Sequence, residues 1–297
     1  LGLAVSLELP LVVIDVQRGG PSTGLPTKTE ASDLLQAMYG RHGESPVPVV
    51  AARSPSHCFA AAIEAARIAL RYRTPVILLS DGYLANGSEP WRLPDVADLP
   101  DISVPFATEP NHTGPDGEAV FWPYLRDPET LARPWAVPGT PGLEHRIGGL
   151  EKEDGSGNIS YEPSNHELMT ERRAAKVAGI AHDIAPVTLT GDVDGADLLV
   201  LGWGSTWGAI DGGVERSRAR GLRVAHAHLT HLNPFPPNLG EVLAAHPRVL
   251  VPEMNLGQLS RLVRAEYLVD ARAVTKVRGV PFTASEIEDA IVKEMGA

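Results

Sequence analysis

The chain has 297 residues, of which 43% are hydrophobic and 21% charged, with a net charge of −11 at pH 7 and one cysteine, Cys58. A chain of this length can bury a sizeable core and hold two domains, and its acidic balance excludes nucleic acid and anionic membranes as partners, because no basic face is left to neutralise phosphates. The single cysteine excludes an intrachain disulfide, and we expect a soluble, cytoplasmic protein because no signal peptide is recognisable and no apolar run approaches the roughly 20 residues that span a bilayer.

Strand–helix alternation begins at the first residues. The opening stretch LGLAVSLELPLVVIDV has no initiator methionine, and we interpret it as the end of a helix running into a strand, the remainder of a longer polypeptide. Residues 11–16 are apolar except for Asp15 and rich in β-branched side chains, which predicts a strand covered on both faces, as in a parallel sheet. After a glycine-rich segment, Thr27 and Glu30 fit a capping box, and apolar residues at helical spacing predict a helix that ends at Gly40.

A second strand–helix unit repeats this pattern. Residues 47–52 predict a strand, Ser54 and Pro55 a helix start, and residues 76–82 the next buried strand. The apolar stripe of the intervening helix is predicted to consist of Phe59, Ile63, Ala66 and Leu70. Alternation of this kind predicts an α/β fold.

The pattern dissolves between Pro90 and Pro186, where turn residues dominate and only one helix, from about residue 165 to 180, is predicted. A second α/β unit follows. Its predicted strands are 197–203, 222–228, 248–254 and the short 274–277, and its predicted helices are 206–219, 238–245, 255–269 and 285–295. We therefore predict a first domain over residues 1–110, a connecting and loop region over 111–190, and a second domain over 191–297.

The segment QRGGPSTGLPT, which follows the first strand, has the composition of an anion site. Its glycines allow close backbone approach, and Ser22 and Thr23 offer hydroxyl donors. The guanidinium of Arg18 matches a carboxylate in two parallel hydrogen bonds. A surface turn in which Arg18 pairs with a nearby aspartate is an equally good interpretation of the residues alone.

The stretch DVQRGGPSTGLPTKTE closely resembles the signature loop of the α subunit of 2-oxoacid:ferredoxin oxidoreductases, and of the 2-oxoglutarate enzyme in particular. The likeness continues over essentially the whole chain, through TPVILLSDGYLANGSEPW, GTPGLEHRIGG, GWGSTWG, HLNPFPPNLGEVL and VPEMNLGQL. The resemblance implies an incomplete, pyrimidine-type thiamine-diphosphate-binding parallel-sheet domain, followed by an α/β domain like the C-terminal domain of transketolases.

The resemblance also implies an activity, oxidative decarboxylation of a 2-oxoacid to an acyl-CoA with electrons passed to ferredoxin. By resemblance Arg18 and Thr23 bind the substrate carboxylate, with Ser22 a weaker candidate. A partner β subunit is expected to hold thiamine diphosphate, Mg²⁺ and a [4Fe-4S] cluster, since this chain has no GDG motif and one cysteine. The expected partners are this β subunit, ferredoxin, the 2-oxoacid and coenzyme A.

Alternatives stay open within and outside this class. The preferred substrate could be pyruvate or a branched-chain 2-oxoacid instead of 2-oxoglutarate. The glutamate that activates the thiamine ring in the family has no match here, so a non-catalytic assembly or binding module with a degenerate carboxylate pocket is the competing hypothesis. We expect no catalytic residue and no metal ligand in this chain.

Three other groups of residues have alternative interpretations. Glu144 and His145 begin a glycine-dotted loop that the resemblance places near the active-site entrance, either as a gate over the substrate or as an ordinary interface loop. Three histidines near 228 are better interpreted as core or interface residues than as metal ligands: His226, His228 and His231. The cations of the 165–180 helix are predicted to form a solvated face: Arg172, Arg173 and Lys176.

Overall fold

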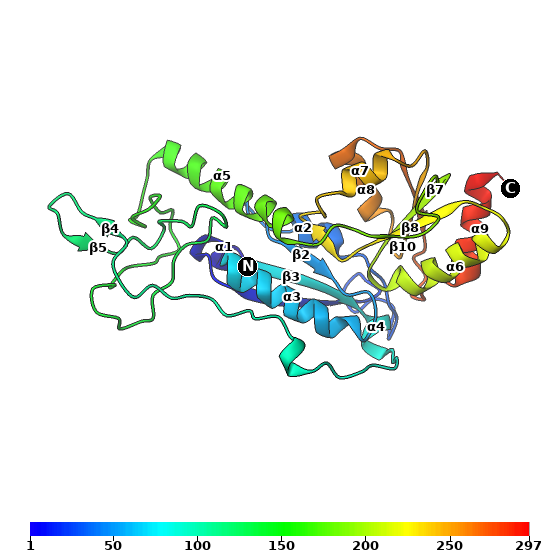
Figure 1. Ribbon diagram of the computed structural model, residues 1–297, viewed down its shortest axis with the longest axis horizontal. Helices are drawn as coiled ribbons and strands as arrows, with labels where there is room; N and C mark the ends of the chain where they lie inside the picture. The colour runs from blue at the N-terminus through cyan, green and yellow to red at the C-terminus, as the bar shows by residue number, and fades with distance from the viewer. Residues whose placement is uncertain (297) are drawn as a thin grey trace.

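Two sheets, each with a mainly parallel strand arrangement, organise the computed structural model, which describes residues 1–296 (Figure 1). The first sheet has the strand order β1–β3–β2–β9. Its parallel strands are β1 (Leu11–Gln17), β3 (Pro75–Asp81) and β2 (Val49–Ala51), and β9 (His231–Asn233) runs antiparallel to β2. The α/β fold class is confirmed.

Helix α3 (His57–Tyr72) covers one face of the first sheet through small side chains. Its buried residues are Ala61, Ala65, Ile68, Ala69 and Tyr72, and they pack on Val50, Val76 and Leu78 of the sheet. The predicted apolar stripe is wrong, because its four members lie on the helix face opposite the buried one and are half-buried or exposed: Phe59, Ile63, Ala66 and Leu70. Alanines allow a close helix–sheet approach that a stripe of larger residues would prevent.

Strand β1 lies at the edge of its sheet, and no described strand pairs with its other edge. Ile14 and Val16 are 59% and 49% exposed, so the prediction of a strand covered on both faces is wrong. The apolar run specifies an extended segment with buried neighbours, but it does not specify how many neighbours the strand has.

The predicted capping box is also wrong. Helix α2 (Leu34–Tyr39) begins later than predicted, with Asp33 as its N-cap and no side-chain cap, and ends at Gly40 as predicted. Glu30 instead accepts a hydrogen bond from the Ser32 hydroxyl. The backbone N–H of Asp33 donates to the side chain of Gln17, so a residue from the end of β1 takes the place of the capping box.

The second sheet has the strand order β11–β10–β7–β8–β6, with all neighbours parallel except β6 and β8. Its strands are β6 (Leu189–Gly191), β7 (Leu198–Trp203), β8 (Val224–Leu229), β10 (Val249–Glu253) and β11 (Ala271–Thr275). Figure 1 shows α6 (Trp207–Ala219) and α9 (Ala284–Met295) on one side of it, and α7 (Leu239–Ala244) and α8 (Gln258–Tyr267) on the other. The strand and helix predictions are confirmed here, except that β11 starts earlier than predicted and β6 was not predicted.

The two sheets share one hydrophobic core. Val49, Ile77 and Leu79 of the first sheet belong to the same buried cluster as Leu199, Leu201 and Trp203 of the second. Strand β9 follows β8 directly yet pairs with β2, so the chain crosses between the sheets. The proposed domain limits of 1–110, 111–190 and 191–297 stay a prediction.

The part of the chain that separates the two sheets in sequence is mostly irregular. It extends to one end of the molecule (Figure 1). Its elements are α4 (Gly82–Asn86), η1 (Val96–Asp98), the pair β4 (His112–Thr113) and β5 (Ala119–Val120), α5 (Pro163–Gly179) and η2 (Ile180–Asp183). The predicted helix corresponds to α5. Within residues 1–296, no helix is long and apolar enough to cross a membrane.

Lys176 corrects the prediction of a solvated face on α5. Its ammonium is buried and donates to the carboxylate of Glu8, which follows α1 (Gly2–Leu7), at 2.6 Å. Arg126 pairs with the same carboxylate. A 3.6-residue period assigns a position to a helix face, but it cannot show that a carboxylate from the start of the chain covers that face.

Candidate functional site

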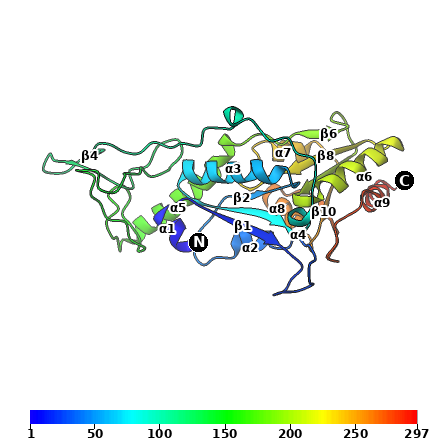
Figure 2. The same ribbon diagram turned by 90° about the horizontal axis from the view of Figure 1, so that it is seen from below.

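The glycine-rich loop leaves the carboxyl end of β1, where it projects beyond the first sheet (Figure 2). Ligands in open parallel sheets bind at this end of the strands. The loop is closed at its base by two backbone hydrogen bonds, in which Gly19 N donates to Lys28 O and Leu25 N donates to Gly19 O, both at 3.0 Å. Residues 20–27 therefore form an exposed tip on a fixed base.

Gly24 makes this closure possible. Its φ is +58°, and a Cβ atom at this position would lie 1.8 Å from the carbonyl oxygen of Gly19. No side chain can occupy that space without opening the loop. The spacing G-x-x-x-x-G from Gly19 to Gly24 thus allows the backbone to turn back on itself at the carboxyl end of β1.

Both ends of the loop are fixed to the sheet by side chains. Gln17 donates to Ser80 O at 3.0 Å and accepts from Asp33 N at 3.0 Å, joining β3 to the start of α2. Thr29 donates its hydroxyl to Asp81 at 3.1 Å. Asp81 also accepts from the backbone N–H groups of the first turn of α4 and caps that helix.

The three residues predicted to bind the carboxylate lie together at the loop. Arg18, Ser22 and Thr23 are all exposed. No carboxylate among residues 1–296 lies within salt-bridge distance of Arg18. The alternative of a surface turn held by an Arg18–aspartate pair within this chain is therefore excluded, and the guanidinium fork is free to take an external anion.

Two carboxyl groups lie on the segments that flank the loop, Asp15 on β1 and Asp33 at the start of α2. Burial raises the pKa of Asp15, and the negative charge of Asp33 raises it further. Burial also raises the pKa of Asp33. The fold thus makes full ionisation of both groups less favourable.

Glu144 and His145 do not lie near Arg18 within this chain. Both are exposed and line a cavity of about 670 Å³ together with Leu9 and Pro10, at the amino end of β1. The His145 ring lies against Phe121 and its Nδ1 contacts Leu143 O at 2.7 Å. The seven residues of β1, roughly 20 Å of strand, separate this loop from Arg18, and its gating role stays a prediction.

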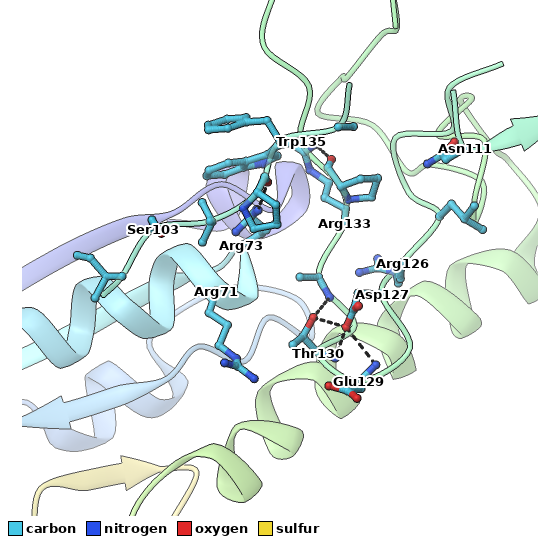
Figure 3. Close-up of a pocket in the computed structure, with 18 of the residues that line it drawn as sticks. Arg71, Arg73, Ser103, Asn111, Arg126, Asp127, Glu129, Thr130, Arg133 and Trp135 are labelled. Atoms are coloured by element: carbon cyan, nitrogen blue, oxygen red, sulfur yellow. Dashed lines mark hydrogen bonds between the residues drawn. The ribbon is translucent and has the colours of Figure 1, made fainter. Parts of the chain in front are cut away.

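A second cavity, of about 720 Å³, is lined by arginines (Figure 3). It also lies at the amino ends of the strands, because Arg73 stands two residues before the start of β3. Arg73 donates to Leu70 O at the end of α3 and stacks over Trp135, and Arg133 donates to Leu7 O at the end of α1. These guanidiniums donate to carbonyl oxygens at the carboxyl ends of helices, where cations are stabilised. The loop at the opposite, carboxyl ends of the strands is therefore the better candidate site.

Three histidines lie on β8 and β9. No group of three His, Cys, Asp or Glu side chains within residues 1–296 is arranged to hold a metal ion. His226 and His228 pack edge to face with ring centroids 5.6 Å apart, and His231 contacts Glu64 at 3.0 Å. Burial lowers the pKa of His226 to about 4 and that of His228 well below its usual value, as expected for core histidines.

Several residues that build the site were missed by sequence reasoning. Gln17 and Thr29 fix the loop ends. From the second sheet, Gly279 reaches the loop, and Asn255 and Gln258 reach the segment that follows it. The Asn-Leu-Gly turn at 255–257 could have been recognised from composition. The contact of residue 279 could not, because it joins segments some 250 positions apart.

Comparison with known proteins supplies the evolutionary context. The family model for the thiamine diphosphate-binding domain of pyruvate flavodoxin/ferredoxin oxidoreductases matches residues 1–162. The 2-oxoglutarate oxidoreductase subunit KorA of Mycobacterium tuberculosis is 62% identical over 288 residues, which are 97% of this chain and 42% of that protein. The 2-oxoglutarate synthase subunit KorA of Methanothermobacter marburgensis is 30% identical over 98% of this chain and 76% of its own length.

A solved structure shares the fold throughout. The 2-oxoglutarate:ferredoxin oxidoreductase of Magnetococcus marinus, determined with 2-oxoglutarate, coenzyme A and succinyl-CoA bound, superimposes with a TM-score of 0.91 at 35% identity. The match covers 99% of this chain and 50% of the other. The present chain therefore spans half or less of the length of this protein and of the mycobacterial relative.

Proposed function

Because the chain belongs to the pyruvate flavodoxin/ferredoxin oxidoreductase family, in its thiamine diphosphate-binding part, we propose that it forms part of the α subunit of a 2-oxoglutarate:ferredoxin oxidoreductase. The reaction is the oxidative decarboxylation of 2-oxoglutarate to the corresponding acyl-CoA, with electrons passed to ferredoxin. The preference for 2-oxoglutarate over pyruvate or branched-chain 2-oxoacids rests on the substrates named for these relatives.

The glycine-rich loop carries the proposed substrate site. Arg18 binds the substrate carboxylate through two parallel hydrogen bonds, and the hydroxyl of Thr23, with Ser22 beside it, donates to the same acid. The observation that carries this assignment is an exposed arginine without a carboxylate partner among the described residues, on a loop closed at the carboxyl end of a parallel strand.

The role of these residues is to bind and orient the acid. Thiamine diphosphate supplies the decarboxylation chemistry when bound, acting as the sink for the electron pair that carbon dioxide leaves behind. 2-Oxoglutarate has two carboxylates, and one of them leaves as carbon dioxide. In this proposal Arg18 holds the other, distal carboxylate, which stays on the substrate throughout the reaction. The loop closure through Gly24 and the Gln17 bridge hold the backbone on both sides of Arg18.

The remaining functions belong to a partner in this proposal. A β subunit holds thiamine diphosphate, Mg²⁺ and the iron–sulfur cluster, since the described residues offer no metal-binding group of three side chains and the chain has one cysteine. Ferredoxin and coenzyme A bind to the assembled enzyme, which we place in the cytoplasm. The carboxylate of the 2-oxoacid is then buried between the loop and the partner.

Steady-state kinetics of the purified assembly that contains this chain test the proposal. Arg18→Ala is expected to lower kcat/KM for 2-oxoglutarate by roughly 30- to 900-fold. This corresponds to about 2–4 kcal/mol of activation free energy, the scale for losing one partner of a desolvated charge pair. Arg248→Ala, which removes an exposed arginine at the amino end of β10, is the control and should change kcat/KM less than twofold. An Arg18→Ala enzyme with the kinetics of this control contradicts the assignment, and a higher kcat/KM for pyruvate than for 2-oxoglutarate contradicts the substrate.

A further inference from the structure

The tip of the glycine-rich loop rests on a segment from the far end of the chain. The connection between β11 and α9 packs against it through Gly279, whose φ is +69°. A Cβ atom on Gly279 would lie 2.5 Å from Leu25 Cδ2 and 2.7 Å from Lys28 Cβ. Leu25 and Lys28 are the two residues whose backbone closes the loop onto Gly19. The contact therefore lies directly at the loop closure.

The connection is itself firmly held. Lys276 donates its ammonium to Pro281 O at 2.8 Å and to the carboxylate of Glu286 at 2.7 Å. Glu286 also completes a capping box with Thr283 at the start of α9. The backbone N–H of Lys276 donates to Glu253 O at 3.0 Å, which joins the connection to β10. Gly279 is thus presented to the loop by a rigid support.

A second contact from the same unit holds the segment that follows the loop. Asn255 donates to Ala31 O at 2.7 Å, and Ala31 N donates to Met254 O at 3.1 Å. Gln258 donates to Ser32 O and accepts from Leu35 N at 2.9 Å. The connections after β10 and after β11 therefore both hold the chain that carries Arg18, although they belong to the other sheet.

We propose that these two connections of the second sheet position the substrate loop, with Gly279 as a positioning residue that acts through Leu25 and Lys28. The inference rests on the proposed function of Arg18. Carbon atoms pack at about 3.5–4.0 Å, so a side chain at 279 displaces the loop closure by about 1 Å. We expect a displacement of this size to move the backbone of Arg18 relative to the substrate carboxylate and so to weaken substrate binding.

The kinetic effect has a defined form. Arg18 holds a carboxylate that is present in both the bound substrate and the transition state. A displaced loop therefore weakens the binding of both states to the same extent. Loss of such uniform binding raises KM and leaves kcat unchanged. A general loss of stability instead lowers the amount of active enzyme and therefore kcat.

The test compares Gly279→Ala with Gly43→Ala in the purified assembly. Gly43 has the same φ of +69°, but a Cβ there would meet no atom within 4 Å, so it reproduces the backbone strain without the contact. We expect Gly279→Ala to raise KM for 2-oxoglutarate about tenfold with kcat within twofold of wild type, and Gly43→Ala to leave both unchanged. Equal KM values for the two variants overturn the proposal, as does a fall in kcat at constant KM.

Two further variants make the result specific. Adding Leu25→Ala to Gly279→Ala removes the closest clashing atom and should recover part of the KM increase; no recovery contradicts action through the loop. If Gly279→Ala does not fold, Gln258→Ala tests the same support without added bulk, and its KM should rise at least threefold, whereas an unchanged KM overturns the proposal. A normal KM in Arg18→Ala refutes the proposed function itself, while a raised KM there with normal Gly279→Ala and Gln258→Ala variants refutes only the positioning role.

Discussion

The buried charge cluster around Glu8 makes a strong prediction about stability. The Glu8 side chain is 2% exposed, and its partners Arg126 and Lys176 are each 3% exposed. Arg126 donates to Glu8 Oε2 at 2.8 Å and Lys176 donates to the same oxygen at 2.6 Å. One carboxylate therefore pairs with two buried cations that come from the irregular region and from α5.

Glu8→Gln keeps the shape of the side chain and removes its charge. Breaking a buried ion pair by removing one partner costs about 3–5 kcal/mol, because an uncompensated charge stays behind. We expect the free energy of unfolding at pH 7 to fall by about this amount. Arg126 keeps Asp154 at 3.8 Å, and burial already lowers the pKa of Lys176 to about 8, so Lys176 can lose its proton and limit the cost.

The pH dependence follows from the same cluster. Burial opposes ionisation of Glu8, but the charges and hydrogen bonds of Lys176 and Arg126 outweigh it and hold its pKa below the usual value of 4.5. The stabilisation is therefore fully present above pH 4.5 and is lost as the pH falls through the lower pKa of the folded state. Glu8→Gln should lack this part of the acid-induced loss of stability.

Urea unfolding followed by circular dichroism measures both effects. The control is Asp197→Asn, which breaks the pair between Asp197 and Arg223, whose side chains are 42% and 60% exposed. Exposed pairs contribute about 0–1 kcal/mol, so this variant should unfold nearly like wild type. If Glu8→Gln loses no more stability than Asp197→Asn, the cluster does not stabilise the fold as argued.

Two other predictions concern the shared core. Burial lowers the pKa of His226 to about 4. Between about pH 6.5 and 4 the unfolded chain therefore binds a proton that the folded chain does not, and the free energy of unfolding should fall by up to about 1.4 kcal/mol per pH unit on acidification. The variant His226→Gln should reduce this slope in an acid titration. Trp203 is 1% exposed and is among the largest fully buried side chains, so Trp203→Ala should lower the free energy of unfolding in urea by about 3–5 kcal/mol. Trp91 is 46% exposed, and Trp91→Ala should lower it far less. Similar losses of stability in the two variants would contradict the assigned core.

Local patterns predicted most elements of the second sheet. Residues 197–203 form a short, mainly apolar run followed by helical periodicity, and the structure has β7 and α6 there. Parallel strands buried on both faces carry this signal in every residue. The short strand β9 carries too few residues to show a period, and its pairing with β2 depends on a crossing between the sheets.

Features that depend on distant partners were not predictable in the same way. Lys176 fits a solvated helix face by periodicity, but Glu8, 168 positions earlier, covers it. Strand β1 has the composition of a central strand and lies at an edge of the described sheet. In both cases the local sequence indicates the element, and long-range packing decides its environment.

The candidate site was predicted in part. Composition indicated an anion-binding loop, and the resemblance assigned Arg18, Thr23 and Ser22 to it; the structure places these residues on a closed loop at the carboxyl end of β1. Glu144 and His145 come from a motif of the same resemblance, yet the chain folds them at the amino end of that strand. Two motifs lie at the same site only if the fold places them at the same ends of the strands. The order of the motifs in the sequence does not predict this.

A crystal structure of the assembled enzyme with a 2-oxoacid bound tests the central claim most directly. The account predicts that both terminal nitrogens of Arg18 lie within about 3 Å of the two carboxylate oxygens of the substrate, with the closed loop pressed against Gly279. An acid bound elsewhere, with Arg18 directed into bulk solvent, would contradict it.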